Sequence, residues 1–293
     1  MGKLVAALGM AGVLLAPPAA ASAFFFSTGN PDGLIGTLSR QASPGKLETE
    51  TADDFMLTQA TSINQATFVG LLPSGALLST IQNVEIEFYH VFPADSANPP
   101  SGNVVTRVNS PADNEIASAT RNGTGGQLSF TASLLNGSFS VANTVVNGIH
   151  GIPNQFTGGE GPATGEEVMF TITFAIPVVL PADHYFFRPE VLLSSGDFLW
   201  LSAPRPIVAP GTPFTPDLQS WIRNDGPGAL APDWERIGTD VTHQGPFNAA
   251  FSLTGQTIPE PATLALLELI ARATQTGPRP RGEPFRKGVD GFG

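Results

Sequence analysis

Carboxylates gather at two places in this sequence, and both could bind a cation. The first group spans seven residues and the second lies in a glycine-rich stretch; their members are Glu48, Glu50, Asp53 and Asp54, and Glu160, Glu166 and Glu167. Flexible oxygen-rich loops suit Ca²⁺, which takes about six to eight oxygen ligands. Neither spacing matches an EF-hand, and solvated carboxylates would equally keep an apolar chain soluble. Calcium binding and simple solvation therefore stay as two interpretations.

Tryptophans could serve a second kind of chemistry, because an exposed indole ring can stack on the apolar face of a sugar. Trp200 stands in an apolar run between Leu199 and Leu201, which predicts a position in the core. Trp221 and Trp234 lie in loop-like sequence with charged neighbours. We expect these two to form an exposed platform that could bind carbohydrate.

Catalytic constellations are not evident. The four histidines are isolated, with no pair at the spacing of a helical zinc site; they are His90, His150, His184 and His243. The sequence has no cysteine, no nucleophile elbow and no phosphate or dinucleotide loop. A glycosidase needs two carboxylates, but their separation cannot be read from a sequence. We assign no catalytic residue and expect the histidines in turns or at the surface.

The composition limits the partners and the fold class. A formal net charge of −11 repels phosphate backbones, so nucleic acid is not an expected partner. Hydrophobic residues make up 41% of the 293 residues and charged residues 13%, which is typical of a globular chain. The 32 glycines and 27 prolines are spread along the sequence, as expected for many short strands joined by turns.

Alternating hydrophobicity is the main structural signal. Between Asn83 and Phe92, apolar side chains alternate with Glu85, Glu87 and Tyr89, which predicts one buried and one solvated face. Similar patterns run through residues 168–175 and 247–253, and further strands are expected at 55–59, 63–71, 185–193 and 198–202. The predicted core residues are Val84, Ile86, Phe88, Val168, Phe170, Ile172, Phe174 and Phe251.

This pattern predicts an all-β chain folded as a two-sheet antiparallel β-sandwich, jelly-roll-like, over residues 24–257. We expect at least ten strands and no helix longer than about three turns. Asn136-Gly137 predicts a tight hairpin between strands at 127–135 and 138–146. Long Pro/Gly loops at 93–103, 148–165 and 204–216 are expected to be either functional or disordered.

Residues 1–23 have the features of a secretory signal peptide. Lys3 supplies the positive charge, residues 4–15 the apolar stretch, and Ala21-Ser22-Ala23 the small-residue cleavage site. We expect export and a mature chain that begins at Phe24. An exported chain without cysteine must depend on its core and not on disulfides.

The segment Pro259-Glu260-Pro261, followed by the apolar residues 262–267, resembles the PEP-CTERM sorting signal of exported proteins from Gram-negative bacteria. In that family the motif precedes a transmembrane helix and an Arg-rich end, and a membrane protease called an exosortase processes it. The body also resembles uncharacterised exported proteins that carry this signal. The matching stretches are residues 26–33, 52–55, 157–162, 180–186 and 196–206.

Residues 258–293 depart from the family pattern and form a degenerate sorting segment with a polar, basic tail expected to be disordered. A spanning helix needs about 20 apolar residues, but here Glu268 and Arg272 interrupt the run. We therefore expect this segment to fail as a membrane anchor. A reading frame shifted after about Leu267 would account for the departure.

The resemblance implies a non-enzymatic protein of the cell surface or extracellular matrix, with the Sec machinery and an exosortase as partners and exopolysaccharide as an associated polymer. A carbohydrate-binding module with structural calcium is the alternative, and a secreted glycan-active enzyme is a weaker one. Loss of glycan binding on replacing Trp221 or Trp234 would favour the carbohydrate-binding module. Cleavage of a carbohydrate that depends on a pair of carboxylates would favour the glycan-active enzyme.

Overall fold

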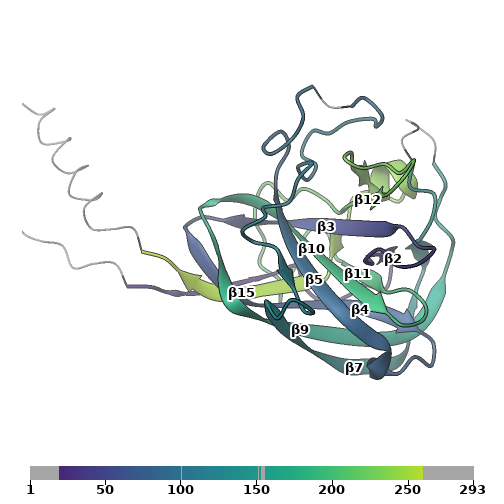
Figure 1. The fold of residues 1–293 in the computed structure, drawn as a ribbon, viewed down its shortest axis with the longest axis horizontal. Coiled ribbons are helices and arrows are strands. Elements are labelled where there is room, and N and C mark those ends of the chain that lie inside the picture. Colours follow the sequence, from purple (N-terminus) through teal and green to yellow (C-terminus); the bar gives the residue numbers. More distant parts are fainter. Residues whose placement is uncertain (1–19, 100, 151, 153–155, 260–293) are drawn as a thin grey trace, which may run out of the picture. The chain divides into compact units, whose positions relative to one another are not determined.

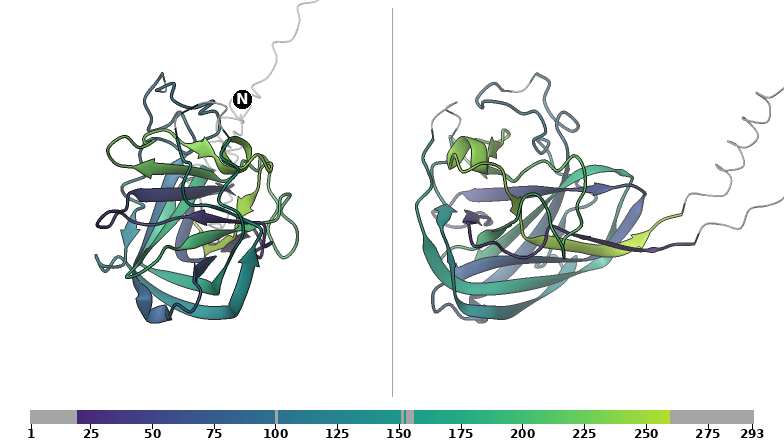
Figure 2. Two further views of the ribbon diagram at one scale, coloured as in Figure 1. Left: turned by 90° about the vertical axis from the view of Figure 1, so that its right-hand side faces the viewer. Right: turned by 180° about the vertical axis from the view of Figure 1, so that it is seen from behind.

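Two β-sheets build the part of the chain that the computed structural model describes, namely residues 20–99, 101–150, 152 and 156–259. Fifteen strands occur in these residues, and most neighbouring strands are antiparallel. Successive strands repeatedly cross from one sheet to the other, as in a jelly roll (Figures 1 and 2). The prediction of an all-β, two-sheet sandwich is confirmed.

The nine-stranded sheet holds the longest strands. Strand β4 lies at its centre and pairs with β9 on one edge and with β15 and then β11 on the other. Strand β7 pairs with β9, while β1, β2, β8 and β14 complete the sheet. The bounds are β1 Ala23–Ser27, β2 Ile35–Leu38, β4 Thr61–Pro73, β7 Leu128–Val141, β8 Asn143–Val145, β9 Ala163–Leu180, β11 Leu199–Ala203, β14 Asn248–Ala249 and β15 Phe251–Thr257.

The six-stranded sheet has the order β13-β12-β3-β10-β5-β6. Its bounds are β3 Glu48–Leu57, β5 Ile81–His90, β6 Arg121–Asn122, β10 Asp183–Leu193, β12 Trp221–Asp225 and β13 Glu235–Arg236. Helical structure in the described residues is limited to two short turns, η1 (Leu78–Thr80) and η2 (Ile237–Val241). Within those residues, no helix has the length and apolarity needed to cross a membrane.

The main core lies between the two sheets and is dominated by phenylalanine. All eight predicted core residues are buried, and so is Trp200. Phe187 of β10 stacks on Phe251 of β15 with ring centroids 5.0 Å apart, so the contact joins the two sheets. Burying one such side chain contributes about 2 kcal/mol. These contacts stabilise a sandwich that contains no disulfide.

The predicted hairpin at Asn136-Gly137 is wrong. Strand β7 runs straight through both residues and pairs with β9 along its length, with irregularities in register on either side of Asn136. Gly137 does not take the positive φ that the predicted turn requires. The reason is the length of β9, whose 18 residues provide a partner for all of β7, so the extra residues are accommodated as bulges. Strand β8 instead pairs in parallel with β2.

The outer face of the six-stranded sheet is covered, contrary to the expectation that the polar face of β5 is solvated. The segment between β5 and β6, drawn in blue, rises above β3 in Figure 1. Its Arg107 pairs with Asp233 (Nη1 to Oδ1, 2.8 Å), and Trp234 donates a hydrogen bond to the carbonyl of Ala112 (3.0 Å). A second, smaller core forms beneath it; its members are Ala52, Tyr89, Phe186, Leu218, Trp221 and Trp234.

The two ends of the sandwich domain lie side by side. Strand β1 pairs antiparallel with β15, so that Ala23 is opposite Gln256. The predicted domain of residues 24–257 corresponds closely to the span from β1 to β15. Residues 1–19 of the predicted signal peptide, and residues 260–293 with most of the predicted sorting segment, lie outside the described residues.

Candidate functional site

The calcium hypothesis expected the carboxylates of residues 48–54 to lie in a flexible loop, but the structure places all four on strand β3. They lie along a strand, with Glu48, Glu50 and Asp54 on its outer face and Asp53 on the face toward the main core. Glu48 and Glu50 contact Arg188 on the outer face, whereas Asp53 accepts hydrogen bonds from Ser220 and Ala249. The four carboxylates therefore do not surround a single point: Glu48 and Glu50 lie at Arg188, and Asp53 and Asp54 contact other residues.

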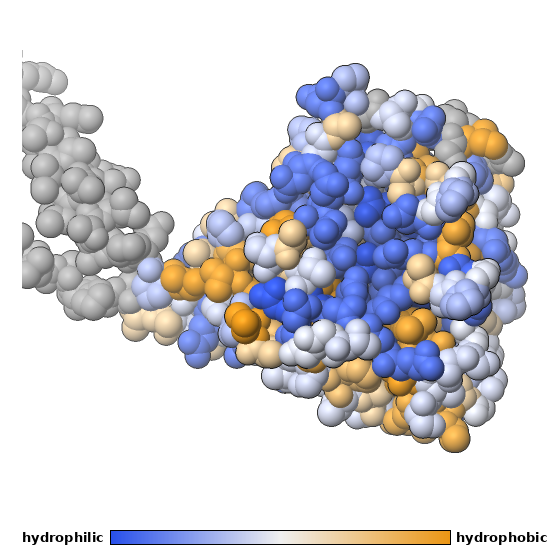
Figure 3. Space-filling model, in the orientation of Figure 1, coloured by the Kyte–Doolittle hydropathy of each residue, from blue (hydrophilic) through white to orange (hydrophobic). Residues whose placement is uncertain are grey.

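Arg188 of β10 is the centre of an ionic network on the outer face. Its guanidinium lies 2.7 Å from Glu190, 2.9 Å from Glu87 and 3.0 Å from Glu48, measured between the nearest N and O atoms. Glu50 and Glu85 lie slightly further away, at 3.6 and 4.0 Å. Arg188, Glu50 and Glu190 are almost fully buried. Figure 3 shows hydrophilic residues over the middle of this face, in front of β5 and β10.

Arg223 of β12 supplies the second positive charge of the network. Its Nε donates a hydrogen bond to Glu50 (2.8 Å), and its guanidinium lies 4.4 Å from the centre of the Trp234 ring. Two guanidinium groups therefore face five carboxylates. The excess negative charge favours protonation of some of these carboxylates in the folded protein.

The pKa shifts in the network follow this charge balance. Burial raises the pKa of Glu190 well above its usual value and that of Glu87 to about 7, although Arg188 opposes both shifts. For Glu50, burial is outweighed by Arg188 and Arg223, and the pKa is lowered. For Arg188, burial acts to lower the pKa, but the surrounding carboxylates outweigh this effect, and the pKa is raised well above its usual value. Burial thus favours the protonated forms of Glu190 and Glu87, whereas the two guanidinium groups favour the ionised form of Glu50.

The second predicted carboxylate group is also dispersed. Glu160 accepts hydrogen bonds from the backbone amides of Val146 and Asn147, both at 2.8 Å. Glu166 lies on β9 and accepts one from Gly75 (3.0 Å), and burial raises the pKa of its neighbour Glu167. In the described part of the chain, no group of three or more His, Asp or Glu side chains is placed to hold a metal ion.

The predicted tryptophan platform is wrong. The exposed fractions of Trp221 and Trp234 are 1% and 0%, so neither ring is available to stack on a sugar. Of the four charged neighbours that suggested exposure, Arg223 and Asp233 are themselves buried, Arg236 is half-buried and Asp225 is exposed. Segments distant in sequence cover the two tryptophans, and a local sequence pattern cannot show such coverage.

His184 is the histidine with the closest carboxylate contact, because its Nε2 lies 2.6 Å from Oδ2 of the buried Asp54. The same oxygen accepts a hydrogen bond from the backbone amide of Leu218 (3.0 Å). The pKa of Asp54 is raised by burial, and that of Asp53 is raised well above its usual value by burial and then by Asp54. Asp53 and Asp54 thus attach the loop between β11 and β12 to strand β3.

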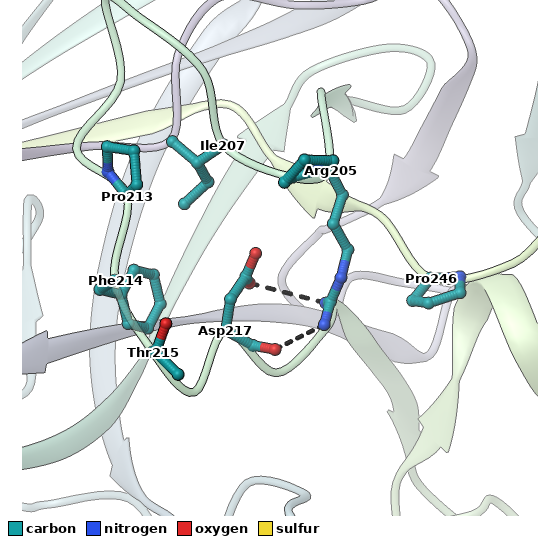
Figure 4. Close-up of a pocket in the computed structure, with 8 residues that line it drawn as sticks. Arg205, Ile207, Pro213, Phe214, Thr215, Asp217 and Pro246 are labelled. Carbon is teal, nitrogen blue, oxygen red and sulfur yellow. Dashed lines mark hydrogen bonds and ion pairs between the residues drawn. The ribbon is translucent and has the colours of Figure 1, made fainter.

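That loop forms one wall of a hollow of about 630 Å³ (Figure 4). Phe214, Ile207 and Pro213 supply apolar surface, while Arg205 and Asp217 supply charge. Figure 4 shows Asp217 between Phe214 and Arg205. Residues 204–216 match the long Pro/Gly loop that was expected to be either functional or disordered, but the local sequence does not single out these side chains.

Comparisons with protein-family models, with curated proteins and with solved structures give no match for this chain. The sorting-signal resemblance and the function it implies therefore rest on the residues of the sequence.

Proposed function

We propose that this chain is an exported, non-enzymatic protein of the cell surface or extracellular matrix of a Gram-negative bacterium, with an exosortase-type sorting segment in its ancestry. The observation that carries the proposal is the pairing of β1 with β15. In a mature chain that begins at Phe24, this pairing runs from Phe24, opposite Gly255, to Ser27, opposite Ser252.

This pairing brings two predicted processing points to the same end of the domain. The predicted signal cleavage follows Ala23, and the sorting motif begins at Pro259, two residues beyond β15. Processing at both points would leave the sandwich from Phe24 to Thr257 intact. This arrangement supports display, with the Sec machinery and an exosortase as the partners that deliver and process the chain.

The absence of cysteine from the sequence is consistent with this environment. The large aromatic core and the buried ion pairs, such as Arg107 with Asp233, stabilise the domain without disulfide formation. A net charge of −11 favours solubility outside the cell and disfavours nucleic acid as a partner. Exopolysaccharide remains the polymer that the proposed location would bring near it.

Expression of the full chain in a Gram-negative host tests the proposal. We expect the protein outside the cytoplasm, with Phe24 as its first residue by N-terminal sequencing. Ala23→Phe should block cleavage, because the position before the cut requires a small residue, whereas Ser22→Phe should be processed normally. Recovery of the wild-type protein in the cytoplasm with residues 1–23 intact would overturn the proposal.

A further inference from the structure

The hollow between the β11–β12 loop and Pro246 is lined by one aromatic ring, several apolar side chains and a facing Arg–Asp pair. The Phe214 ring is held edge-on between Phe26 (centroids 5.5 Å apart) and His184 (5.8 Å). Because Asp54 fixes both His184 and the Leu218 amide, the ring and the loop that carries it have defined positions. The shape of the hollow is therefore fixed by contacts within the fold.

Its polar atoms have unused hydrogen-bonding capacity. Arg205 Nη1 and Asp217 Oδ1 are buried, lie 3.6 Å apart and have no hydrogen-bond partner among the described residues. Behind them, Asn248 is 1% exposed and donates to Asp217 Oδ2 (3.3 Å), while its own Oδ1 is also unpartnered. Buried polar groups are normally satisfied. The side chains of Arg205 and Asp217 are 23% and 15% exposed, so a ligand in the hollow can reach this ion pair and complete its hydrogen bonding.

The chemistry of the pair selects the class of ligand. Asp217 repels an anion and Arg205 repels a cation, whereas a neutral hydroxyl group can donate to the carboxylate and accept from the guanidinium. Two neighbouring hydroxyls could contact the exposed parts of both side chains at once. The Phe214 ring and the flanking prolines offer an apolar surface suited to the C–H face of a sugar. A volume of about 630 Å³ lies in the range of small-molecule sites.

We propose that this hollow binds a neutral sugar residue of a glycan, with adjacent hydroxyls on Arg205 and Asp217 and an apolar sugar face on Phe214. The net charge of −11 further disfavours an anionic polysaccharide as the ligand. The site is distinct from the two buried tryptophans. It goes beyond the proposed export of the chain and does not depend on it.

Calorimetric titration of the full chain tests the site. The probes are tetrasaccharides of glucan, mannan, galactan and xylan, with tetragalacturonate as the anionic comparator. We expect at least one neutral probe to bind and the anionic probe to bind at least about tenfold more weakly. Asp217→Asn and Arg205→Met should each weaken the neutral interaction by about tenfold or more, since each removes a charged hydrogen-bond partner.

Two further variants separate loss of the site from loss of the fold. Asp197→Asn alters a matched Arg–Asp pair elsewhere, between Arg40 and Asp197 (2.9 Å), and should leave binding unchanged. Thr215→Leu adds bulk to an exposed lining residue without removing a hydrogen bond seen in the structure, and should weaken binding several-fold at an unchanged Tm. Absence of binding to all four neutral probes, or binding that survives both Asp217→Asn and Arg205→Met, would overturn the proposal. Neither result would bear on the export test.

Discussion

Arg188 lies among more carboxylates than its single charge can balance. Removing charges from water is unfavourable, and such a cluster persists only when its members are paired or protonated. Here Arg188 and Arg223 balance part of the charge, and burial raises the pKa of Glu87 and Glu190, so that protons balance another part. The polar face of a strand can thus be buried when opposite charges and protonation offset the cost of removing its carboxylates from water.

Glu87 gives this conclusion a measurable pH dependence. Its pKa is raised from 4.5 to about 7, first by burial, so the folded state favours the protonated form. The stabilisation is therefore complete below about pH 4.5 and is lost as the pH rises through about 7. We expect Glu87→Gln, which stays neutral, to remove this loss. One pKa unit corresponds to about 1.4 kcal/mol, so the variant should gain on the order of 2 to 3 kcal/mol relative to wild type between pH 5 and pH 8.

Urea unfolding of both proteins across this pH range measures the effect. Glu115→Gln is the matched control, because Glu115 is exposed and its replacement should leave the pH profile of the wild type unchanged. If the free energy of unfolding of Glu87→Gln and of wild type depends on pH in the same way, the conclusion that burial raises the pKa of Glu87 is wrong.

At the scale of elements, long strands override local turn signals. Asn136-Gly137 is a strong hairpin signal, yet the residues before and after it pair with the same partner strand, β9. Elsewhere in the sheet a glycine is required by packing. A Cβ atom at Gly70 of β4 would lie 2.1 Å from the Phe198 ring and 2.5 Å from the carbonyl oxygen of Leu199, because β11 approaches β4 at this point.

Alanine replacements at these two glycines test the sheet arrangement. Gly137 is exposed, and a Cβ atom there would come no closer than 3.4 Å, to Glu166 Oε2. We expect Gly137→Ala to change the free energy of unfolding by less than about 0.5 kcal/mol. Gly70→Ala should destabilise by about 2 kcal/mol or more, because backbone atoms would have to move. A hairpin with positive φ at Gly137 would instead make Gly137→Ala costly, by about 1 kcal/mol or more.

At the scale of the whole domain, protein groups satisfy several of the carboxylates that suggested calcium binding. Asp53 and Asp54 connect strand β3 to the β11–β12 loop and to β14, and Glu160 binds backbone amides. Stability of the domain should therefore come from its core and ion pairs, and not from a bound cation.

Thermal unfolding with calcium or with chelator tests this expectation. A ligand that binds only the native state raises Tm as its concentration exceeds its Kd. We expect the same Tm, within about 1 °C, in millimolar Ca²⁺ and in EDTA, with magnesium as the control for ionic strength. A Tm that rises with calcium and not with magnesium would show a calcium site that the described carboxylates do not explain.

Hydrophobic alternation determined the fold class, the approximate strands and the core, because a residue's place in a period-two pattern depends on near neighbours alone. The alternation of Val84, Ile86 and Phe88 with Glu85 and Glu87 correctly placed the first three in the core. Whether the other face of that strand is wet depended on the segment between β5 and β6, which tertiary folding brings over it, and on Arg223 of β12, a strand of the same sheet whose side chain reaches Tyr89. The same cause buried Trp221 and Trp234.

The candidate sugar site likewise combines a loop that the sequence predicted with contacts that the tertiary structure decided. The sequence marked residues 204–216 as a long Pro/Gly loop, which is a property of composition. The pairing of Arg205 with Asp217, the support of Phe214 by Phe26 and His184, and the unpartnered Asn248 join segments up to 222 residues apart (26 to 248). Such contacts are set by the packing of two sheets, and tertiary structure alone decided them.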